Sequence, residues 1–289
     1  MVALQAPTPF DPKNWGERVD IKTISQSRIP ARGPESWRPL PHDTFVTMIE
    51  QAFDRHGFEI SEPVHYRAKS RQNVKIKDPS EFGRFLSLYG IGHPGLPDIE
   101  GLNWESGFGN SYDMSTAAGG GIGTRLQVCS NGEYMGSMFG FKRKHTVGID
   151  REDTGRFESI YTLVDNCVGG LLTHASSVAQ KIHVQTVTEC SDVDARWVIL
   201  EAAKRGVIGA AATMRVLEHW ETPEHVEFKD RNVWSLRNSF TSNDRGQSLL
   251  TQSDRFKQLS GILDDRFGTA ESAESLDSSE ETVSMAADF

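Results

Sequence analysis

The hydrophobic periodicity of this chain changes along its length, and that change limits its possible folds most strongly. In the first half, apolar residues recur at every second position over short stretches such as 58–66, which predicts strands that bury one face. From Asp153 onward they recur every three to four positions, which predicts helices. Strands followed by helices, without alternation, indicate the α+β class. We therefore expect a strand-rich N-terminal half with β-hairpins, packed against a helical C-terminal half.

Turn and breaker residues set the expected boundaries in the first half. A helix is expected at 42–56, because its apolar residues share one face and a glycine follows it. The other expected elements are a hairpin with one strand at 58–66 and a second beginning at Val74 and Ile76, a short helix at 78–89, a loop rich in glycine and proline at 91–109, and strands at 124–129 and 134–141 joined around Asn131-Gly132.

The second half is expected to hold helices and a charged tail. The expected helices are a long one over 153–183, bent at Gly169-Gly170, and shorter ones at 192–205, 210–220, 232–240 and 249–267. Residues 1–41 are rich in proline and polar residues, which predicts an extended arm that lies over the body or is partly disordered. Residues 268–289 have almost nothing to bury and are predicted to form a disordered acidic tail. Between them we expect an α+β domain at 42–267, as one domain rather than two.

Composition indicates the compartment. No apolar run approaches the roughly 18–20 residues that span a bilayer. The beginning of the chain carries no basic stretch followed by an apolar block, as a secretory signal would. The three cysteines, Cys129, Cys167 and Cys190, are widely spaced and odd in number, which favours reduced, buried thiols. We expect a protein of the cytoplasm, in a bacterial host, that does not interact with membranes.

The negative charge is distributed unevenly. The net charge is −9, but the residues after Gly268 contain six acids and no Lys or Arg, so the rest of the chain carries only −3. Inside that remainder, the segment 66–77 carries five positive charges and no acid. A nearly neutral body can still bind phosphate through a local basic face. The alternative is that such a charge run is simply a solvated surface.

Three clusters combine basic with aromatic residues, which is typical of proteins that bind single-stranded nucleic acid. Cations follow the phosphates there, and each base stacked on an aromatic ring contributes about 1–3 kcal/mol. The first cluster, on the predicted hairpin, consists of Arg67, Lys69, Arg71, Lys75 and Lys77. The second, at the end of the later hairpin, consists of Phe139, Phe141, Lys142, Arg143 and Lys144, with Arg125 on the partner strand. The third consists of Arg231, Trp234 and Arg237. The alternative for the aromatic residues is burial in the core.

The tail ends in an aromatic residue after acids, Asp288-Phe289. It resembles the tails of bacterial and phage single-stranded-DNA-binding proteins, which recruit partner proteins and compete with DNA for the basic surface. That resemblance implies that Asp288 and Phe289 bind replication or recombination proteins. The alternative is a terminus that serves only solubility.

No motif predicts a catalytic residue, a cofactor or a metal ion. The cluster Gly119-Gly120-Gly121-Ile122-Gly123 lacks the lysine of a phosphate-binding loop and leads into a strand, so we expect a flexible loop. Asp113 could bind a divalent ion together with the nearby Asn103, Glu105 and Asn110. A role in turn formation is the commoner one for such residues.

Three segments of the chain resemble one known family. They are Asn110-Ser-Tyr-Asp-Met-Ser-Thr-Ala-Ala, Arg125-Leu-Gln-Val-Cys-Ser-Asn-Gly132 and Arg231-Asn-Val-Trp-Ser-Leu-Arg-Asn-Ser-Phe-Thr241. In this order they resemble segments of the phage/plasmid-like protein family (domain of unknown function 932), over roughly residues 41–267. Tyr112 stands where a histidine is more usual. The resemblance implies a phage or mobile-element origin and a role in replication, recombination or host takeover.

Three hypotheses follow for the function. The first is a non-enzymatic protein that binds or anneals single-stranded DNA in phage or plasmid replication and recombination, as a homo-oligomer. The second is a protein-interaction module, such as an inhibitor or adaptor of host machinery, which the net acidity, the proline-rich arm and the tail favour. The third and weakest is a metal-dependent nucleic-acid enzyme that uses Asp113.

Overall fold

The computed structural model describes most of the chain, and its described residues fall into two compact units. The described residues are 16–30, 33, 35, 37–73, 75–126, 132–133, 141–143, 158–243 and 249–268. The first unit, here called the sheet unit, lies within Met1–Ser176 and Phe240–Lys257. The second, the helical unit, lies within Ser177–Ser239 and Gln258–Phe289. The expected boundaries at residues 41 and 268 stay predictions.

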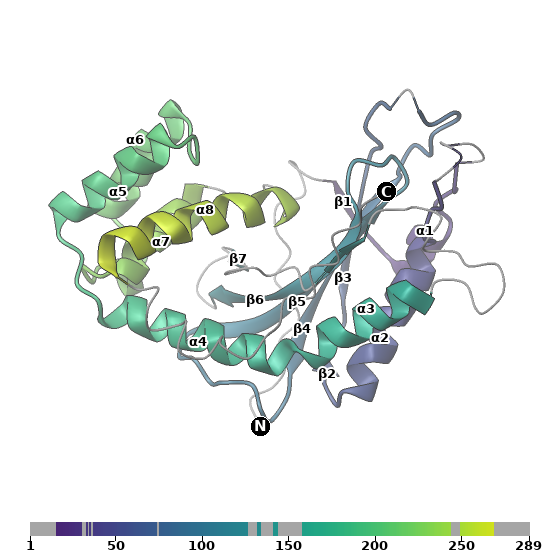
Figure 1. Ribbon diagram of the computed structural model, residues 1–289, viewed down its shortest axis with the longest axis horizontal. Helices are drawn as coiled ribbons and strands as arrows, with labels where there is room; N and C mark the ends of the chain where they lie inside the picture. The colour runs from purple at the N-terminus through teal and green to yellow at the C-terminus, as the bar shows by residue number, and fades with distance from the viewer. Residues whose placement is uncertain are drawn as a thin grey trace, which may run out of the picture. The chain divides into compact units, whose positions relative to one another are not determined.

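The sheet unit is built on an antiparallel sheet (Figure 1). Its strands are β1 (Glu17–Val19), β2 (Glu59–Ile60), β3 (Val64–Ala68), β4 (Arg84–Gly92), β5 (Leu102–Ser111), β6 (Ala118–Leu126), β7 (Gly132–Glu133) and β8 (Phe141–Arg143). They pair in the order β1-β3-β4-β5-β6-β7, while β2 pairs with β4 and β8 pairs with β6. β6 and β7 pair antiparallel, and Gly132, which was expected in the turn, is the first residue of β7 and lies opposite Arg125.

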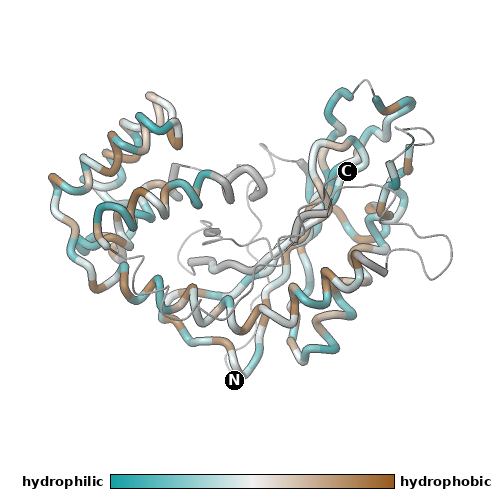
Figure 2. Tube along the Cα trace, in the orientation of Figure 1, coloured by the Kyte–Doolittle hydropathy of each residue, from teal (hydrophilic) through white to brown (hydrophobic). Residues whose placement is uncertain are grey.

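Helix α2 (His42–Arg55) covers one face of the sheet, as its apolar spacing predicted. The ring of Phe108 on β5 is fully buried and has its centroid 6.4 Å from that of Phe45 and 6.0 Å from that of Phe53, both edge-to-face. Such T-shaped contacts match the positive edge of one ring to the negative face of the next. Figure 2 shows the matching alternation of hydrophobic and hydrophilic residues along the helix.

Helix α3 (Glu158–Gly169) lies beside α2, and its residue Asp165 binds a residue of α2. The Asp165 carboxylate accepts hydrogen bonds from Nε of Arg55 at 3.0 Å and from its Nη2 at 2.8 Å. Arg55 also lies over the ring of Tyr161. The Arg55 hydrogen bonds hold the pKa of Asp165 below its usual value. The two helices are therefore joined by a charge-assisted contact as well as by their apolar faces.

The glycine cluster forms part of β6, so the expectation of a flexible loop is wrong. Gly120 lies opposite Phe108 of β5, and a Cβ on Gly120 would come within 2.0 Å of Cδ1 of that ring. The ring occupies the space above the glycine backbone. Glycine is required here because the strand passes directly beneath a large side chain of its neighbour.

Two further expectations in the first half are wrong. Residues 84–92 are strand β4 where a helix was expected, and residues 102–111 are strand β5 where a loop was expected. β3 pairs with β4, not with a strand at 74–76. Residues 85–90, Phe-Leu-Ser-Leu-Tyr-Gly, are all buried, so they lack the alternation of apolar and polar residues that marks a half-buried strand. A short continuous apolar run is ambiguous between helix and strand until its partners are known.

Part of the expected proline-rich arm belongs to the sheet unit. Residues 17–19 form β1, which pairs antiparallel with β3. Helix α1 (Ile21–Ser25) follows at once, and Asp20 caps it by accepting a hydrogen bond from the backbone N–H of Thr23 at 2.7 Å. This segment is therefore paired to the sheet.

The helices of the second half follow the predicted boundaries closely. They are α4 (Leu171–Val187), α5 (Asp192–Lys204), α6 (Ala210–Glu221), the short 3₁₀ helix η3 (Val226–Phe228), α7 (Val233–Asn243) and α8 (Leu249–Phe267). The expected long helix is interrupted at Gly170, between α3 and α4, as the glycine pair predicted. The sheet in the first half and the helices in the second confirm the α+β class. Within the described ranges, no helix combines the length and the apolar character needed to cross a bilayer.

Candidate nucleic-acid interface

One end of the sheet collects strand ends that are far apart in sequence. Ala68, the last residue of β3, lies opposite Arg84, the first residue of β4. Arg84 in turn lies opposite Ser111, the last residue of β5. At the beginning of β6, Ala118 pairs with Arg143, the last residue of β8. The loop that follows β3, the turn between β5 and β6, and the end of β8 therefore share this end of the sheet.

We name this end of the sheet the basic end, because of the residues on its loops and strand ends. Its cations with described side chains are Lys69, Arg71, Lys75, Lys77 and Arg84. The first four are exposed and come from the loop of residues 69–83 between β3 and β4. Arg84 is partly buried.

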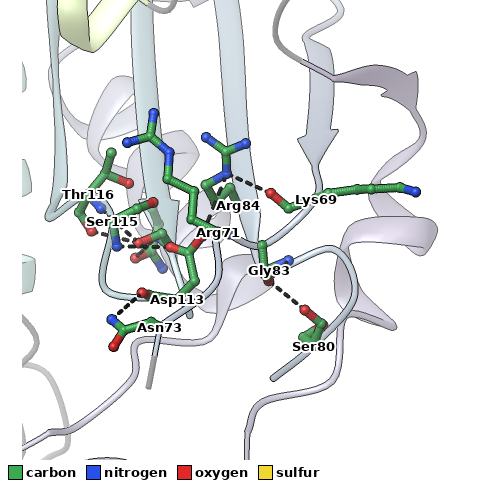
Figure 3. A network of polar contacts seen from close by, with 12 residues as sticks. Lys69, Arg71, Asn73, Ser80, Gly83, Arg84, Asp113, Ser115 and Thr116 are labelled. Carbon is green, nitrogen blue, oxygen red and sulfur yellow. Dashed lines mark hydrogen bonds and ion pairs between the residues drawn. The ribbon is translucent and has the colours of Figure 1, made fainter. Parts of the chain in front are cut away.

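A buried carboxylate holds the 69–83 loop in place. Asp113, only 2% exposed, follows β5 and accepts a hydrogen bond at Oδ2 from the backbone N–H of Arg71, at 2.5 Å (Figure 3). Its Oδ1 accepts from the backbone N–H of Ser115 at 2.9 Å, which closes the turn that such a residue commonly forms. The side-chain amide of Asn73 donates to the Asp113 carbonyl at 3.0 Å. One aspartate therefore joins the 69–83 loop to the β5–β6 turn.

A second set of hydrogen bonds closes the loop on itself. The Ser70 hydroxyl donates to the carbonyl of Ser80 at 2.5 Å and accepts from the backbone N–H of Gly83 at 2.9 Å. A Cβ at Gly83 would lie 2.4 Å from that hydroxyl oxygen, so a side chain there would displace it. The two ends of the loop are thus tied together just before β4 begins.

Two guanidinium groups lie close together at this end. Figure 3 shows the side chains of Arg71 and Arg84 extending in the same direction from the Asp113 carboxylate. Nε of Arg84 donates to the carbonyl of Lys69 at 2.9 Å and lies 3.7 Å from Oδ2 of Asp113. Burial lowers the pKa of Arg84; the Asp113 carboxylate opposes this effect, and the positive charge of Arg71 adds to it. The pair is a concentration of positive charge that an anion would stabilise.

The exposed cations differ in how far they are neutralised. Among residues with described side chains, Arg71, Lys75 and Lys77 form no ion pair with an acid. Nζ of Lys69 lies 4.0 Å from Glu81, with both side chains more than 70% exposed, so that pair is weak. These groups remain available to an external anion.

Arg67, from the first predicted cluster, is placed differently. Its Nε donates to Oε1 of Glu17 at 2.5 Å, and its guanidinium lies 4.0 Å from the ring centroid of Phe82. Strand β1 supplies that glutamate, fifty positions earlier in the chain. The ion pair neutralises the cation, so Arg67 is not one of the free charges that were expected.

The second predicted cluster is divided by the register of β6. The backbones of Lys142 and Arg143 pair with Gly119 and Ala118, which places both residues at the basic end, with Phe141 next to them opposite Gly120. Arg125 lies near the other end of β6, opposite Asn103. It lies seven positions along the strand from Ala118, which corresponds to about 23 Å. The backbone of Arg125 is therefore distant from those of Phe141, Lys142 and Arg143. Phe139, Lys144, Asp288 and Phe289 lie outside the described residues.

The third predicted cluster belongs to the helical unit, and its two helical members are buried there. Arg237 is completely buried, with Nη1 donating to Oγ of Ser260 at 3.0 Å, and Trp234 is 9% exposed. Arg231 is exposed, but Nη1 donates to the carbonyl of Trp220 at 2.7 Å and the guanidinium lies over that ring. The expected surface is not formed, because residues 233–241 of α7 are buried on all sides.

Arg84 was not among the predicted site residues, whereas Asp113 takes the turn-forming role that was expected to be the commoner one. Arg84 was overlooked because its segment was expected to be a helix. Asp113 was considered as a metal ligand, yet both of its oxygens accept hydrogen bonds from the backbone. The pattern Asp113-Met-Ser115 is the local signal for this turn. Over the described part of the chain, no three His, Cys, Asp or Glu side chains are grouped so that they could hold a metal ion.

The resemblance to the phage/plasmid-like family stays a prediction. Its first quoted segment, 110–118, contains Asp113 and the whole β5–β6 turn. Comparisons with protein-family models, with curated proteins and with solved structures found no match to this chain.

Proposed function

We propose that the basic end of the sheet binds the phosphates of single-stranded DNA, and that the protein is a non-enzymatic binding or annealing protein of phage or plasmid replication and recombination. The observation that carries the proposal is the meeting of two basic segments, 69–84 and 142–143, at one end of the sheet. Of the cations there, Arg71, Lys75 and Lys77 have no acidic partner among the described residues. A polyanion can therefore bind them without first breaking an ion pair.

The fixed loop supports this proposal on energetic grounds. The carboxylate of Asp113 holds the backbone of Arg71, and the Ser70 hydroxyl closes the loop. A loop that is already ordered loses less conformational entropy when it binds. The mutual repulsion of Arg71 and Arg84 is also relieved when a phosphate lies beside both groups.

The remaining parts of the proposal rest on the sequence. Stacking by Phe139 and Phe141 is what would favour a single strand over a duplex. We also propose that Asp288 and Phe289 bind replication or recombination proteins in the cytoplasm of a bacterial host, and that the protein acts as a homo-oligomer.

Fluorescence anisotropy with labelled oligonucleotides at increasing salt tests the proposal. The site variant replaces Arg71, Lys75 and Lys77 with Gln. A matched control replaces three exposed cations elsewhere, Lys22, Lys229 and Lys257, and so changes the net charge equally. Each lost phosphate contact reduces the slope of log K against log salt by about 0.7 for a single strand, so the site variant should lose about two units.

The control variant separates a local site from general charge. We expect it to keep the affinity and salt slope of the unmodified protein, and we expect single strands to bind more tightly than duplexes. An equal loss in both variants would show that only net charge matters. No binding at low salt, or a flat salt response, would refute the proposal.

A second candidate function is a protein-interaction module acting on host machinery. The observation that favours it is a set of exposed apolar side chains on α5, among them Val193 and Leu200. Such a protein would form a stable complex with a host protein and show no affinity for DNA. Affinity purification of the protein from the host detects such a complex, and the anisotropy experiment described above measures the affinity for DNA. The two measurements together distinguish the two candidates. The weakest hypothesis, a metal-dependent enzyme using Asp113, is not supported, because that carboxylate is occupied by backbone N–H groups.

A further inference from the structure

Helix α5 is apolar on two opposite faces. One face is buried in the helical unit and consists of Ala195, Val198, Ile199 and Ala202. The opposite face exposes Val193 by 72%, Trp197 by 39% and Leu200 by 64%. Residues spaced by four and three positions lie on the same side of a helix. We call the three exposed residues the α5 stripe.

A row of exposed apolar side chains such as the α5 stripe is uncommon on a surface that has no binding partner. Single exposed apolar side chains are common, whereas adjacent ones along one helix face mark a surface for association. Arg266, which is paired with Asp194, lies 5.1 Å from the Trp197 ring centroid and leaves it 39% exposed. The stripe therefore retains apolar area that association would bury.

We propose that the α5 stripe binds the α5 stripe of a second copy of this chain, with the two helices antiparallel. Two-fold symmetry requires a surface that is complementary to itself. In an antiparallel pair, Val193 meets the partner's Leu200 and Leu200 meets the partner's Val193, while the two Trp197 rings lie next to the axis. The stripe satisfies this requirement because an aliphatic residue stands at each end and the aromatic one stands between them.

The charges at the two ends of α5 favour a second copy of this chain as the binding partner, with the two helices antiparallel. The first turn of α5 contains Asp192 and Asp194, and its C-terminal end contains Lys204 and Arg205; each of these groups has an ion-pair partner within the chain, and Lys204 is the most exposed of them. Antiparallel helices place each acidic end beside the partner's basic end and align their dipoles favourably. Parallel helices would place like charges together.

The register that joins Val193 to Leu200 makes a more specific charge match. It places Lys204 near the partner's Glu189. The Lys204 side chain is 78% exposed and continues the line of the stripe, four residues after Leu200, and its Nζ also lies 3.3 Å from Oε2 of Glu201 on the same helix. Glu189 is exposed and lies two residues before the N-cap Ser191, and among the described residues it forms no ion pair. The symmetric pair would therefore contain this contact twice.

The size of the helix sets the expected strength. Thirteen residues make a helix about 20 Å long. One helix pair of that length buries less than the roughly 1,200–2,000 Å² of a stable interface. We therefore expect a weak dimer, with a Kd between about 10 µM and 1 mM, whose population rises with concentration.

Sedimentation equilibrium of the full chain, without DNA, tests this proposal over that concentration range. Leu200→Glu should raise the Kd by at least about tenfold, because it places two carboxylates in the apolar contact. A matched control, Met214→Glu, removes an apolar side chain that is 67% exposed on α6 and should leave the Kd unchanged. Far-UV circular dichroism verifies that both variants are folded.

A charge exchange makes the test specific to this register. Lys204→Glu alone should weaken the dimer by about threefold to tenfold, and Lys204→Glu combined with Glu189→Lys should restore it. The proposal is overturned by a monomer at every concentration, by a dimer that Leu200→Glu leaves intact, or by an equal effect of Met214→Glu. Because no DNA is present, failure of DNA binding would leave this result unaffected.

Discussion

Replacing Asp113 with alanine tests whether one carboxylate organises the basic end. The variant removes the acceptor of two backbone hydrogen bonds, from Arg71 and from Ser115. Hydrogen bonds to a charged acceptor contribute about 1.5–3 kcal/mol each. The contact with Arg84 adds less than these hydrogen bonds, because its Nε lies 3.7 Å from Oδ2, beyond hydrogen-bonding distance. Some water will enter to satisfy the freed N–H groups, so we expect a loss of about 3–4 kcal/mol in the free energy of unfolding.

Urea denaturation followed by tryptophan fluorescence measures this loss, since the buried Trp104 reports on the sheet unit. With a slope of about 3 kcal/mol per molar urea, the midpoint should fall by about 1 M or slightly more. Asp98→Ala is the control, because Asp98 is an exposed acid between β4 and β5 with no hydrogen bond or ion pair among the described residues. It should change the free energy of unfolding by less than about 0.5 kcal/mol.

We expect Asp113→Ala to lower the DNA affinity, although the change in charge alone would raise it. Removing a negative charge beside the cations should by itself strengthen the binding of a polyanion. We expect weaker binding, because the 69–83 loop loses its fixed conformation and must be ordered when DNA binds. An unchanged or higher affinity, or a stability loss below about 1 kcal/mol, would refute the idea that this carboxylate preorganises the site.

Three further substitutions test the packing and the buried polar groups. Gly120→Ala should cost about 1–3 kcal/mol in urea denaturation, because the new methyl group overlaps the ring of Phe108. Burial lowers the pKa of His65 below the usual 6.5, so its neutral form stabilises the fold above that pH and this contribution is lost as the pH falls. His65→Gln should therefore show a smaller drop in melting temperature than the unmodified protein between about pH 7.5 and pH 5.5, and an identical drop would contradict this. Ser191→Ala removes the cap that accepts from the backbone N–H of Asp194, so α5 should lose about 0.5–2 kcal/mol, measured by thermal unfolding.

The helices could be predicted from the sequence because their signals are local. α2 and α5 to α8 appear within a few residues of the predicted bounds, and the long helix breaks at the predicted glycine pair. A periodicity of 3.6 residues, a cap such as Ser191 and a break such as Gly170 all operate within one or two turns. Such features can be identified in a short window of sequence. The α+β class follows from the same signals.

The central strands could not be predicted, because their signals depend on their neighbours. Residues 85–90 are mostly apolar and do not alternate with polar ones, since both faces of β4 are buried. The glycines of β6 carry no side-chain pattern at all, and they form a strand because Phe108 of the adjacent strand fills the space above them. Pairing partners on neighbouring strands determined these elements, from Gly120 twelve positions after Phe108 to Ser111 twenty-seven positions after Arg84.

Composition alone located the cations of the basic end, and only the tertiary structure decided which of them are free. Arg67 is neutralised by Glu17, Arg237 is buried in α7, and Arg84 joins the site from a segment expected to be helical. Whether a charge is available depends on which acid or hydrophobic surface the fold brings next to it. Because those neighbours come from distant parts of the chain, a local reading of the sequence identifies the kind of residue but not its surroundings.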